Sequence, residues 1–541
     1  MSEHNQLWWQ SGVIYQIYPR SYMDSNGDGI GDLRGVISKL DYLANTLGVD
    51  AFWLSPFYKS PMADFGYDVS DYCDVDPIFG TLADFDELVK EAHARNLKVV
   101  VDFVPNHCSD QHPWFVEARS SKDNPKRNWF TWRDPKPDGS PPNNWLSVFG
   151  GPAWTLDPQT GQYYLHSFLP QQPDLNWRNP EVKAEMFKAM RFWLDRGVDG
   201  FRIDVAHFIM KDPELRDNPL NTGGASQMQK PMGDYDSQIH LYDKGHADNH
   251  PLYREIRALL NEYDKIAPRM SVGEIHIFDW EEWATYYGNP DDEVHLPFNF
   301  ALVGAPWRAD VLRTVVDNVE RVLTRGQQPN YVFSNHDEPR ISSRLGAESA
   351  RSVMMALLTL RGTPTMYYGD EIGMVNGDIT PDMIIDPWGK NYPELGRDPE
   401  RTPMQWDSSP NAGFSPAGVK TWLPVNADYP TRNVAAQLAD PRSMLNFTRT
   451  LLKLRRESPA LHGGKHTSLN GTPSDVYAYL RESGDQRFVI AINFSGEPRE
   501  FVLNEANGGS IHLSTLMDRT DEAISNGKVS LRPHESVLIR L

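Results

Sequence analysis

The chain of 541 residues contains only two cysteines, Cys73 and Cys108, and no Cys-x-x-Cys pair. Two cysteines cannot form a disulfide framework, and without the paired motif we expect no zinc or thiol-redox site. A basic excess is missing as well, because 73 Asp and Glu outnumber 53 Lys and Arg, which gives a net charge of −20. A general binder of the nucleic-acid backbone needs a basic face, so we expect no nucleic-acid partner.

Long hydrophobic runs are also absent. No stretch approaches the ~20 apolar residues that span a bilayer, so we expect no membrane association. The first ten residues, MSEHNQLWWQ, lack the basic and apolar regions of a secretory signal. These absences predict a soluble cytoplasmic protein, either a monomer or a small homo-oligomer. The 40% hydrophobic content is enough to bury a core and excludes wholesale disorder.

What the sequence does contain is a series of eight short apolar segments with helix-like patterns between them. The segments are nearly continuous, as strands buried on both faces of a parallel sheet should be. They are residues 13–19, 51–56, 99–104, 200–205, 271–276, 295–300, 331–337 and 365–370. Eight strands with intervening helices predict an α/β fold, a (β/α)8 TIM barrel, with a doubly wound sheet as the alternative. Acidic residues at the segment ends favour the barrel: Asp102, Asp204, Glu274, Asp337 and Asp370.

Two insertions and a different C-terminal pattern interrupt this repeat. Residues 106–177 are rich in Trp, Pro, Asn and Asp, which suits an irregular subdomain inserted after the third strand. A second insertion, about 374–430, follows the eighth strand, and short alternating strands begin after about residue 462. We therefore expect a catalytic barrel at 1–105 and 178–462, an inserted subdomain at 106–177, and a C-terminal β-sandwich domain at 463–541.

The segment DSNGDGIGD at 24–32 places oxygen-bearing side chains at alternate positions. Oxygen ligands at this spacing suit Ca2+ or Mg2+, and Gly29 permits a sharp turn. Gly35 stands where an EF-hand carries its bidentate Glu, so a complete EF-hand is not expected. A polar loop stiffened by Asx turns is the alternative to a metal site. We predict a structural Ca2+ or Mg2+ held by Asp24, Asn26, Asp28, Ile30 (through its carbonyl) and Asp32.

Three carboxylates at strand ends indicate acid–base and nucleophilic chemistry. Arg202 lies two residues before Asp204, on the same side of a strand, and a guanidinium keeps a neighbouring carboxylate ionised. Glu274 would act as a general acid if desolvation raised its pKa. His336 and Asp337 end a third strand. Any one of these acids could be an ion-paired or capping residue, but their convergence at one barrel mouth favours an active site.

Seven motifs occur in order along nearly the whole chain: WWQSGVIYQIYPRSY, DFVPNH, GFRIDV, GEIH, SNHDEPR, RGTPTMYYGDEIG and RTPMQW. Together they resemble the α-amylase superfamily, glycoside hydrolase family 13, and within it the α-glucosidase and oligo-1,6-glucosidase branch. The resemblance implies that Asp204 is the nucleophile, Glu274 the acid/base and Asp337 the third carboxylate. It also implies a metal at the 24–32 loop and no organic cofactor. The substrate-binding residues that it implies are Asp64, Tyr67, His107, Arg202, His336 and Arg401, with Arg397 as a weaker candidate beside Arg401.

The function that the resemblance implies is a retaining, exo-acting α-glucosidase that releases terminal glucose from short α-glucosides and transfers glucose as a side activity. Val205 follows the nucleophile, and valine at this place in relatives goes with α-1,6 preference. A transglucosylase or isomerase acting on sucrose, maltose or trehalose is the enzymatic alternative. The run EPRISSR after Asp337 departs from the pattern of sucrose isomerases. A catalytically inactive sugar-binding or transporter-associated relative is the non-enzymatic alternative.

Overall fold

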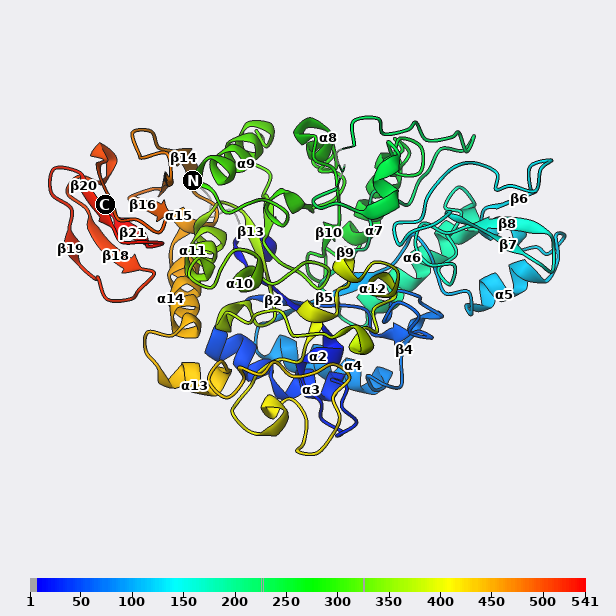
Figure 1. Ribbon diagram of the computed structural model, residues 1–541, viewed down its shortest axis with the longest axis horizontal. Helices are drawn as coiled ribbons and strands as arrows, with labels where there is room; N and C mark the ends of the chain where they lie inside the picture. The colour runs from blue at the N-terminus through cyan, green and yellow to red at the C-terminus, as the bar shows by residue number, and fades with distance from the viewer. Residues whose placement is uncertain (1–6, 225, 227, 325) are drawn as a thin grey trace.

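Eight parallel strands form a closed barrel at the centre of the molecule in the computed structural model, which describes residues 7–224, 226, 228–324 and 326–541 (Figure 1). Around the barrel the order is β1-β2-β5-β9-β10-β11-β12-β13, and β13 pairs with β1 to close it. The strands are β1 Ile14–Ile17, β2 Ala51–Leu54, β5 Lys98–Phe103, β9 Gly200–Ile203, β10 Met270–Gly273, β11 Leu296–Asn299, β12 Asn330–Val332 and β13 Thr363–Tyr367. The predicted (β/α)8 barrel is confirmed.

The strands are buried on both faces, which explains their continuous apolar sequence. In β2 all four residues are buried; Trp53 points into a cluster inside the barrel with Val100 and Phe298, whereas Phe52 and Leu54 pack toward the surrounding helices. Because successive side chains of a strand point to opposite faces, one apolar run supplies both the core inside the barrel and the core under the helices.

Helices surround the barrel, and some of them begin at capping residues. Thr81 and Asp84 form a capping box at the start of α4, and Asn179 caps α6, which begins with a proline. The predicted helical stretch around Val36–Leu47 is divided into α3 and a π-helical turn, η1. The helices of this layer are α1 Trp8–Ser11, α2 Pro19–Tyr22, α3 Leu33–Ser38, η1 Tyr42–Leu47, α4 Leu82–Ala94, α6 Pro180–Asp195, α7 Asn249–Asn261, α8 Trp280–Thr285, α9 Ala309–Val322, α10 Ile341–Arg344, α11 Ala350–Thr359 and α14 Met444–Glu457.

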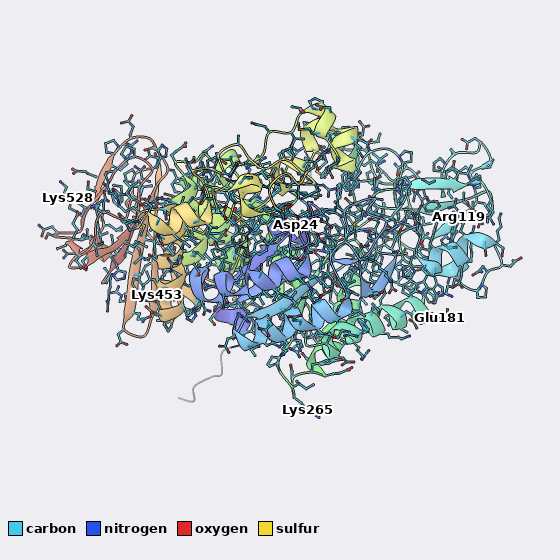
Figure 2. All side chains as sticks on the ribbon, turned by 90° about the horizontal axis from the view of Figure 1, so that it is seen from below. Asp24, Arg119, Glu181, Lys265, Lys453 and Lys528 are labelled. Atoms are coloured by element: carbon cyan, nitrogen blue, oxygen red, sulfur yellow. The ribbon has the colours of Figure 1, made fainter. Side chains whose placement is uncertain are left out.

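Two insertions leave the barrel after its third and eighth strands. Between β5 and β9 the chain forms α5 Pro113–Ser120 and a three-stranded sheet of β6 Trp132–Arg133, β7 Trp154–Asp157 and β8 Gln162–Leu165. After β13 it runs through short turns that include η5 Asp370–Ile372, α12 Pro387–Asn391 and η8 Asp398–Arg401. The first insertion, which carries Arg119, and the C-terminal domain, which carries Lys528, lie at opposite ends of the molecule (Figure 2).

The C-terminal domain is an antiparallel all-β unit, as predicted. Its six-stranded sheet has the order β14-β15-β16-β21-β18-β19, and β17 and β20 form a second, two-stranded sheet. The strands are β14 Lys465–Ser468, β15 Val476–Ser483, β16 Gln486–Asn493, β17 Arg499–Val502, β18 Ser510–Ser514, β19 Glu522–Ala523, β20 Lys528–Leu531 and β21 Ser536–Arg540. Val489, Val529 and Val537 lie in one core cluster, whereas Tyr479 and Ile490 join the core of the barrel domain. Among the described residues no helix is both long and apolar enough to cross a membrane.

Candidate active site

The three predicted catalytic carboxylates meet at one cavity. Asp204 directly follows β9, Glu274 directly follows β10, and Asp337 lies on the loop after β12. These are the carboxyl ends of barrel strands, where TIM-barrel enzymes carry their active sites. All three side chains line the cavity, which is open at its mouth.

Arg202 forms ion pairs with two of these carboxylates, those of Asp204 and Glu274. Its Nη1 lies 2.6 Å from Oδ1 of Asp204, and its Nη2 lies 2.7 Å from Oε2 of Glu274. The same Nη1 is 3.0 Å from Oδ1 of Asp102, and the guanidinium stacks on Trp53. Because one planar guanidinium contacts both Asp204 and Glu274, their carboxylates are close together. This favours the short spacing of retaining glycosidases, about 5–5.5 Å, over the about 6.5–9.5 Å of inverting enzymes.

The charges of this buried cluster do not balance, since one guanidinium faces three carboxyl groups. Burial raises the pKa of Asp204 well above its usual value, and burial also raises the pKa of Asp102, to about 6. Burial opposes ionisation of Glu274 too, but Arg202 and His276 outweigh it and hold its pKa at about 2. Groups this close titrate together. We conclude that the cluster retains a proton, because burial disfavours three adjacent negative charges. The two pKa directions are the reverse of those expected from the sequence, in which Arg202 keeps Asp204 ionised and desolvation raises the pKa of Glu274.

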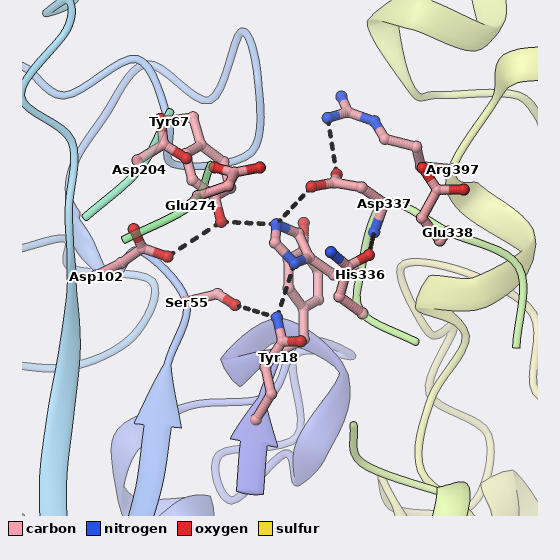
Figure 3. Close-up of polar contacts among 12 residues, drawn as sticks. Tyr18, Ser55, Tyr67, Asp102, Asp204, Glu274, His336, Asp337, Glu338 and Arg397 are labelled. Carbon is pink, nitrogen blue, oxygen red and sulfur yellow. Dashed lines mark hydrogen bonds and ion pairs between the residues drawn. The ribbon is translucent and has the colours of Figure 1, made fainter. Parts of the chain in front are cut away.

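Asp337 is held by two arginines from the second insertion. Its Oδ1 lies 3.1 Å from Nη1 of Arg397, and its Oδ2 lies 3.3 Å from Nε2 of His336 (Figure 3). Oδ1 also lies 2.7 Å from Nη2 of Arg401. Burial raises the pKa of Asp337, but His336 and the two arginines outweigh it and hold it well below its usual value. Asp337 is therefore an ionised acceptor facing the cavity.

Of the two arginines, Arg397 contacts the cavity more directly than Arg401 does. It lines the cavity and joins Asp337 to Asp64, whose Oδ1 is 2.7 Å from Nη2. Arg401 is fully buried; it also bonds the carbonyl of His336 and so supports the loop that carries Asp337. The sequence favoured Arg401 as the pocket-closing arginine, whereas the structure brings Arg397 to the cavity wall. Asp386, which the sequence did not indicate, binds Arg397 at 2.6 Å.

The other predicted binding residues surround the Asp64 end of the cavity. The ring of Tyr67 stacks on that of His336, and its hydroxyl lies 2.6 Å from Nε2 of His336. Burial lowers the pKa of His336 to about 3 and that of His107 to about 4, so both rings are neutral hydrogen-bonding groups at neutral pH. Gln172 lies between Asp64 and His107, within 3.2 Å of each. Only the folded insertion brings this glutamine here.

Part of the cavity lining is apolar, which the sequence did not reveal. Phe149 and Phe168 come from the first insertion, Phe208 from the loop after β9, and Trp388 from α12. Contributions from three separate segments leave no local sequence pattern. The apolar residues lining the cavity are Val148, Phe149, Phe168, Val205, Phe208, Met228, Met232 and Trp388.

Val205 adopts a backbone conformation that is unusual for a β-branched residue, with φ = 36°. In this conformation its amide N–H donates to Oε2 of Glu274 at 2.8 Å. The strained residue thereby fixes the acid next to the nucleophile, and strain of this kind is typical of functional sites.

The 24–32 loop lies outside this cavity. Asp24 is buried and accepts from the amides of Asn26, Gly27 and Gly29, and from the hydroxyl of Ser415. Asp32 caps α3 through the Gly35 amide. The side-chain and carbonyl oxygens that remain chemically suit Ca2+ or Mg2+. Within the described part of the chain, however, no three His, Cys, Asp or Glu residues converge as a metal centre, so the metal stays a prediction.

A closed parallel barrel with paired carboxylates at its mouth fits a glycoside hydrolase. The model of the alpha amylase catalytic domain matches residues 16–464, and the chain belongs to this family. A probable alpha-glucosidase of Rhizobium meliloti is 44% identical, covering 92% of this chain and 91% of the relative. An oligo-1,6-glucosidase of Parageobacillus thermoglucosidasius is 40% identical, covering 99% of each chain. The solved structure of the alpha-glucosyl transfer enzyme XgtA is 40% identical with a TM-score of 0.92, covering 99% of this chain and all of that one.

Proposed function

We propose that this glycoside hydrolase is a retaining, exo-acting α-glucosidase that releases terminal glucose from short α-glucosides, with a preference for α-1,6 links and some α-1,4 activity. The observation that carries the proposal is the contact of one guanidinium with both Asp204 and Glu274. That contact favours the short carboxylate spacing used for a covalent intermediate. The α-glucosidase and oligo-1,6-glucosidase relatives support the substrate class.

The mechanism has two steps. Asp204 attacks C1 of the terminal glucose while Glu274 donates a proton to the departing glycosidic oxygen, which breaks the C1–O bond. Glu274 then takes a proton from water or from an acceptor hydroxyl, whose oxygen attacks C1 and releases Asp204. Asp337, ionised between Arg397 and Arg401, would accept hydrogen bonds from sugar hydroxyls as the ring distorts.

Exo action is supported by the closed end of the cavity. Arg397 bonds both Asp64 and Asp337, so a guanidinium and two carboxylates fill the end near which Tyr67 and His336 stack. A terminal glucose fits against such a wall, whereas a continuing chain would meet it. Asp64, Tyr67, His107, Arg202 and His336 keep their proposed substrate-binding roles. Arg397 joins them, and Arg401, proposed from the sequence for the same role, would act on the sugar through Asp337.

Transfer of glucose is the second activity, and the apolar wall favours it. Phe149, Phe168 and Trp388 line the cavity and present few groups that would order an attacking water. The alpha-glucosyl transfer enzyme among the similar structures supports this alternative. An isomerase would use the same residues. An inactive sugar-binding relative is disfavoured because all three carboxylates line one cavity.

The experiment is a substrate panel of isomaltose, maltose, sucrose and trehalose, with the products identified and the Asp204→Ala variant as control. We expect glucose from isomaltose and maltose, and NMR should detect the α-anomer first. An initial β-anomer would contradict retention. Rearranged disaccharides as main products would favour the isomerase, and equal inactivity of both proteins would favour the inactive relative.

The proposal has three further parts. A Ca2+ or Mg2+ ion would bind the loop of Asp24, Asn26, Asp28, Ile30 and Asp32 and would stabilise the fold. The partner is a small α-glucoside, and nucleic acid and membranes are not among the expected partners. The protein would act in the cytoplasm as a monomer or small homo-oligomer.

A further inference from the structure

A chain of hydrogen bonds leads away from Glu274 on the side opposite Arg202. Oε1 of Glu274 lies 2.9 Å from Nε2 of His276, and Nδ1 of the same ring lies 3.1 Å from Oε1 of Gln229. Nε2 of Gln229 donates to Oε1 of Glu338 at 2.7 Å. We call these four residues the Glu274 relay. All four line the cavity, and His276 is held flat against Phe300 at a centroid distance of 4.3 Å.

Glu338 determines which atom donates and which accepts in each hydrogen bond of the Glu274 relay. Its Oε1 lies 3.1 Å from Nζ of Lys230, and a carboxylate paired in this way can only accept hydrogen bonds. The amide of Gln229 must therefore present its NH2 group to Glu338 and its oxygen to His276. Since that oxygen can only accept, Nδ1 of His276 must carry a proton.

With its proton fixed on Nδ1, a neutral His276 has only a lone pair on Nε2. That lone pair faces Oε1 of Glu274, so an ionised Glu274 beside a neutral ring would place two acceptors 2.9 Å apart. The contact is a hydrogen bond only when a proton lies between the two atoms. The proton belongs either to the carboxyl of Glu274 or to a cationic ring.

We propose that His276 is a positioning residue whose tautomer, fixed by Gln229 and Glu338, keeps a proton in its contact with the acid/base Glu274, which delivers that proton to the leaving oxygen. This inference rests on the proposed glucosidase function. His276 acts through Glu274, which it contacts at 2.9 Å.

Other charged groups face this pair from neighbouring elements. Burial favours the protonated form of Glu274, whereas Arg202 and the hydrogen bond from His276 favour the ionised form. The titratable and charged groups around the pair are Asp102, Arg202, Asp204, His207, Asp337 and Glu338. None of them supplies a second acceptor to Nδ1 within the described residues, so Gln229 is the one to change.

The first experiment measures kcat/KM for isomaltose against pH in wild type and Gln229→Leu. Without its acceptor, the ring can carry its proton on Nε2 and donate it to ionised Glu274. Because the ionised form of Glu274 gains a hydrogen bond, its pKa falls. We therefore expect the alkaline limb of the kcat/KM profile to move to lower pH by about one unit. The control is Gln238→Leu, which removes a buried glutamine bonded to Asn144 and not to the relay. A limb that moves equally in both variants, or in neither, overturns the proposal.

The second experiment compares leaving groups and holds even if Gln229→Leu does not fold. His276→Phe keeps the ring stacked on Phe300 but removes both nitrogens. We expect kcat/KM to fall about 10- to 100-fold for isomaltose, whose leaving oxygen needs a proton, and less than about threefold for 2,4-dinitrophenyl α-glucoside, which needs none. Equal losses on both substrates would make His276 purely structural. A wild type without glucosidase activity would instead overturn the proposed function itself.

Discussion

Arg202 donates to the proposed nucleophile Asp204 and to the proposed acid/base Glu274 through different nitrogens, at 2.6 and 2.7 Å. This is the contact by which the fold sets the relative position of the two carboxylates. Its geometry needs a planar group with donors on both terminal nitrogens, which is a property of arginine and not of lysine.

We therefore expect Arg202→Lys to lower kcat for glucose release by about 10²–10³-fold, because a single ammonium cannot bridge both carboxylates and leaves part of their charge unpaired. Steady-state kinetics on isomaltose would measure the loss. Arg216→Lys, which alters the ion pair of an exposed arginine with buried Asp212, is the matched control and should retain normal kinetics. Comparable rates in the two variants would show that charge alone, without the bridging geometry, is enough.

The second prediction concerns linkage and Val205. Its side chain lines the cavity beside the apolar wall, next to Glu274, where the leaving sugar would depart. Threonine has nearly the same size but adds a hydroxyl. Such changes shift discrimination by ~1–3 kcal/mol, or about 10- to 200-fold at most.

Val205→Thr should thus raise the kcat/KM ratio of maltose to isomaltose at least several-fold, with activity on both substrates in each protein. Purified enzymes assayed side by side would give the ratio. A wild type that strongly prefers maltose, together with an unchanged ratio in the variant, would mean that the loops carrying Phe149 and Trp388 decide linkage instead.

The third prediction concerns the 24–32 loop. An ion bound only by the folded state stabilises it by mass action, so added Ca2+ should raise the Tm and a chelator should lower it. Asp28→Asn should remove this response with little change in rate per folded molecule, because the loop lies outside the cavity. Thermal melts with and without Ca2+ would measure it. A wild-type Tm that responds to neither Ca2+ nor Mg2+ would refute the metal.

Asp24→Ala should lower the Tm even without metal. Its carboxylate accepts from three backbone amides and the Ser415 hydroxyl, and losing that acceptor leaves buried donors unsatisfied. The comparison with Asp28→Asn therefore separates loop structure from ion binding. Similar melts for Asp24→Ala and wild type in chelator would contradict the structural role.

The fourth prediction concerns pH and Glu371, which burial holds at a pKa of about 7 despite hydrogen bonds from Tyr15 and Tyr42. The unfolded value is about 4.3, so the folded state binds this proton more tightly. This proton binding adds roughly 3–4 kcal/mol to the free energy of unfolding. The contribution is complete below about pH 4.3 and is lost as the pH rises through about 7.

Glu371→Gln should consequently reduce the fall in Tm between pH 5 and pH 8, although its Tm is expected to be lower throughout. Melts in matched buffers would measure the difference. The exposed Glu505→Gln is the control, and it should keep the wild-type pH dependence. Parallel curves for Glu371→Gln and wild type would contradict the raised pKa.

The strand series and the catalytic carboxylates could be predicted because both are local in sequence. A strand buried on two faces must be continuously apolar, and β2 and β5 carry that pattern without any neighbour being known. Asp204 and Glu274 directly follow strands, and parallel strands in a barrel end at the same mouth. Topology alone therefore brought them together.

The sequence by itself thus determined the barrel, the C-terminal β-domain and the identity of the acids at the mouth. Only the tertiary structure decided which arginine reaches the cavity, how Gln172 and Trp388 line it, and that His276 lies between Glu274 and Gln229. These residues come from loops and insertions, whose paths follow long-range packing and not a repeating pattern. The direction of a side chain on such a loop has no periodic signal in the sequence, because no regular element fixes it.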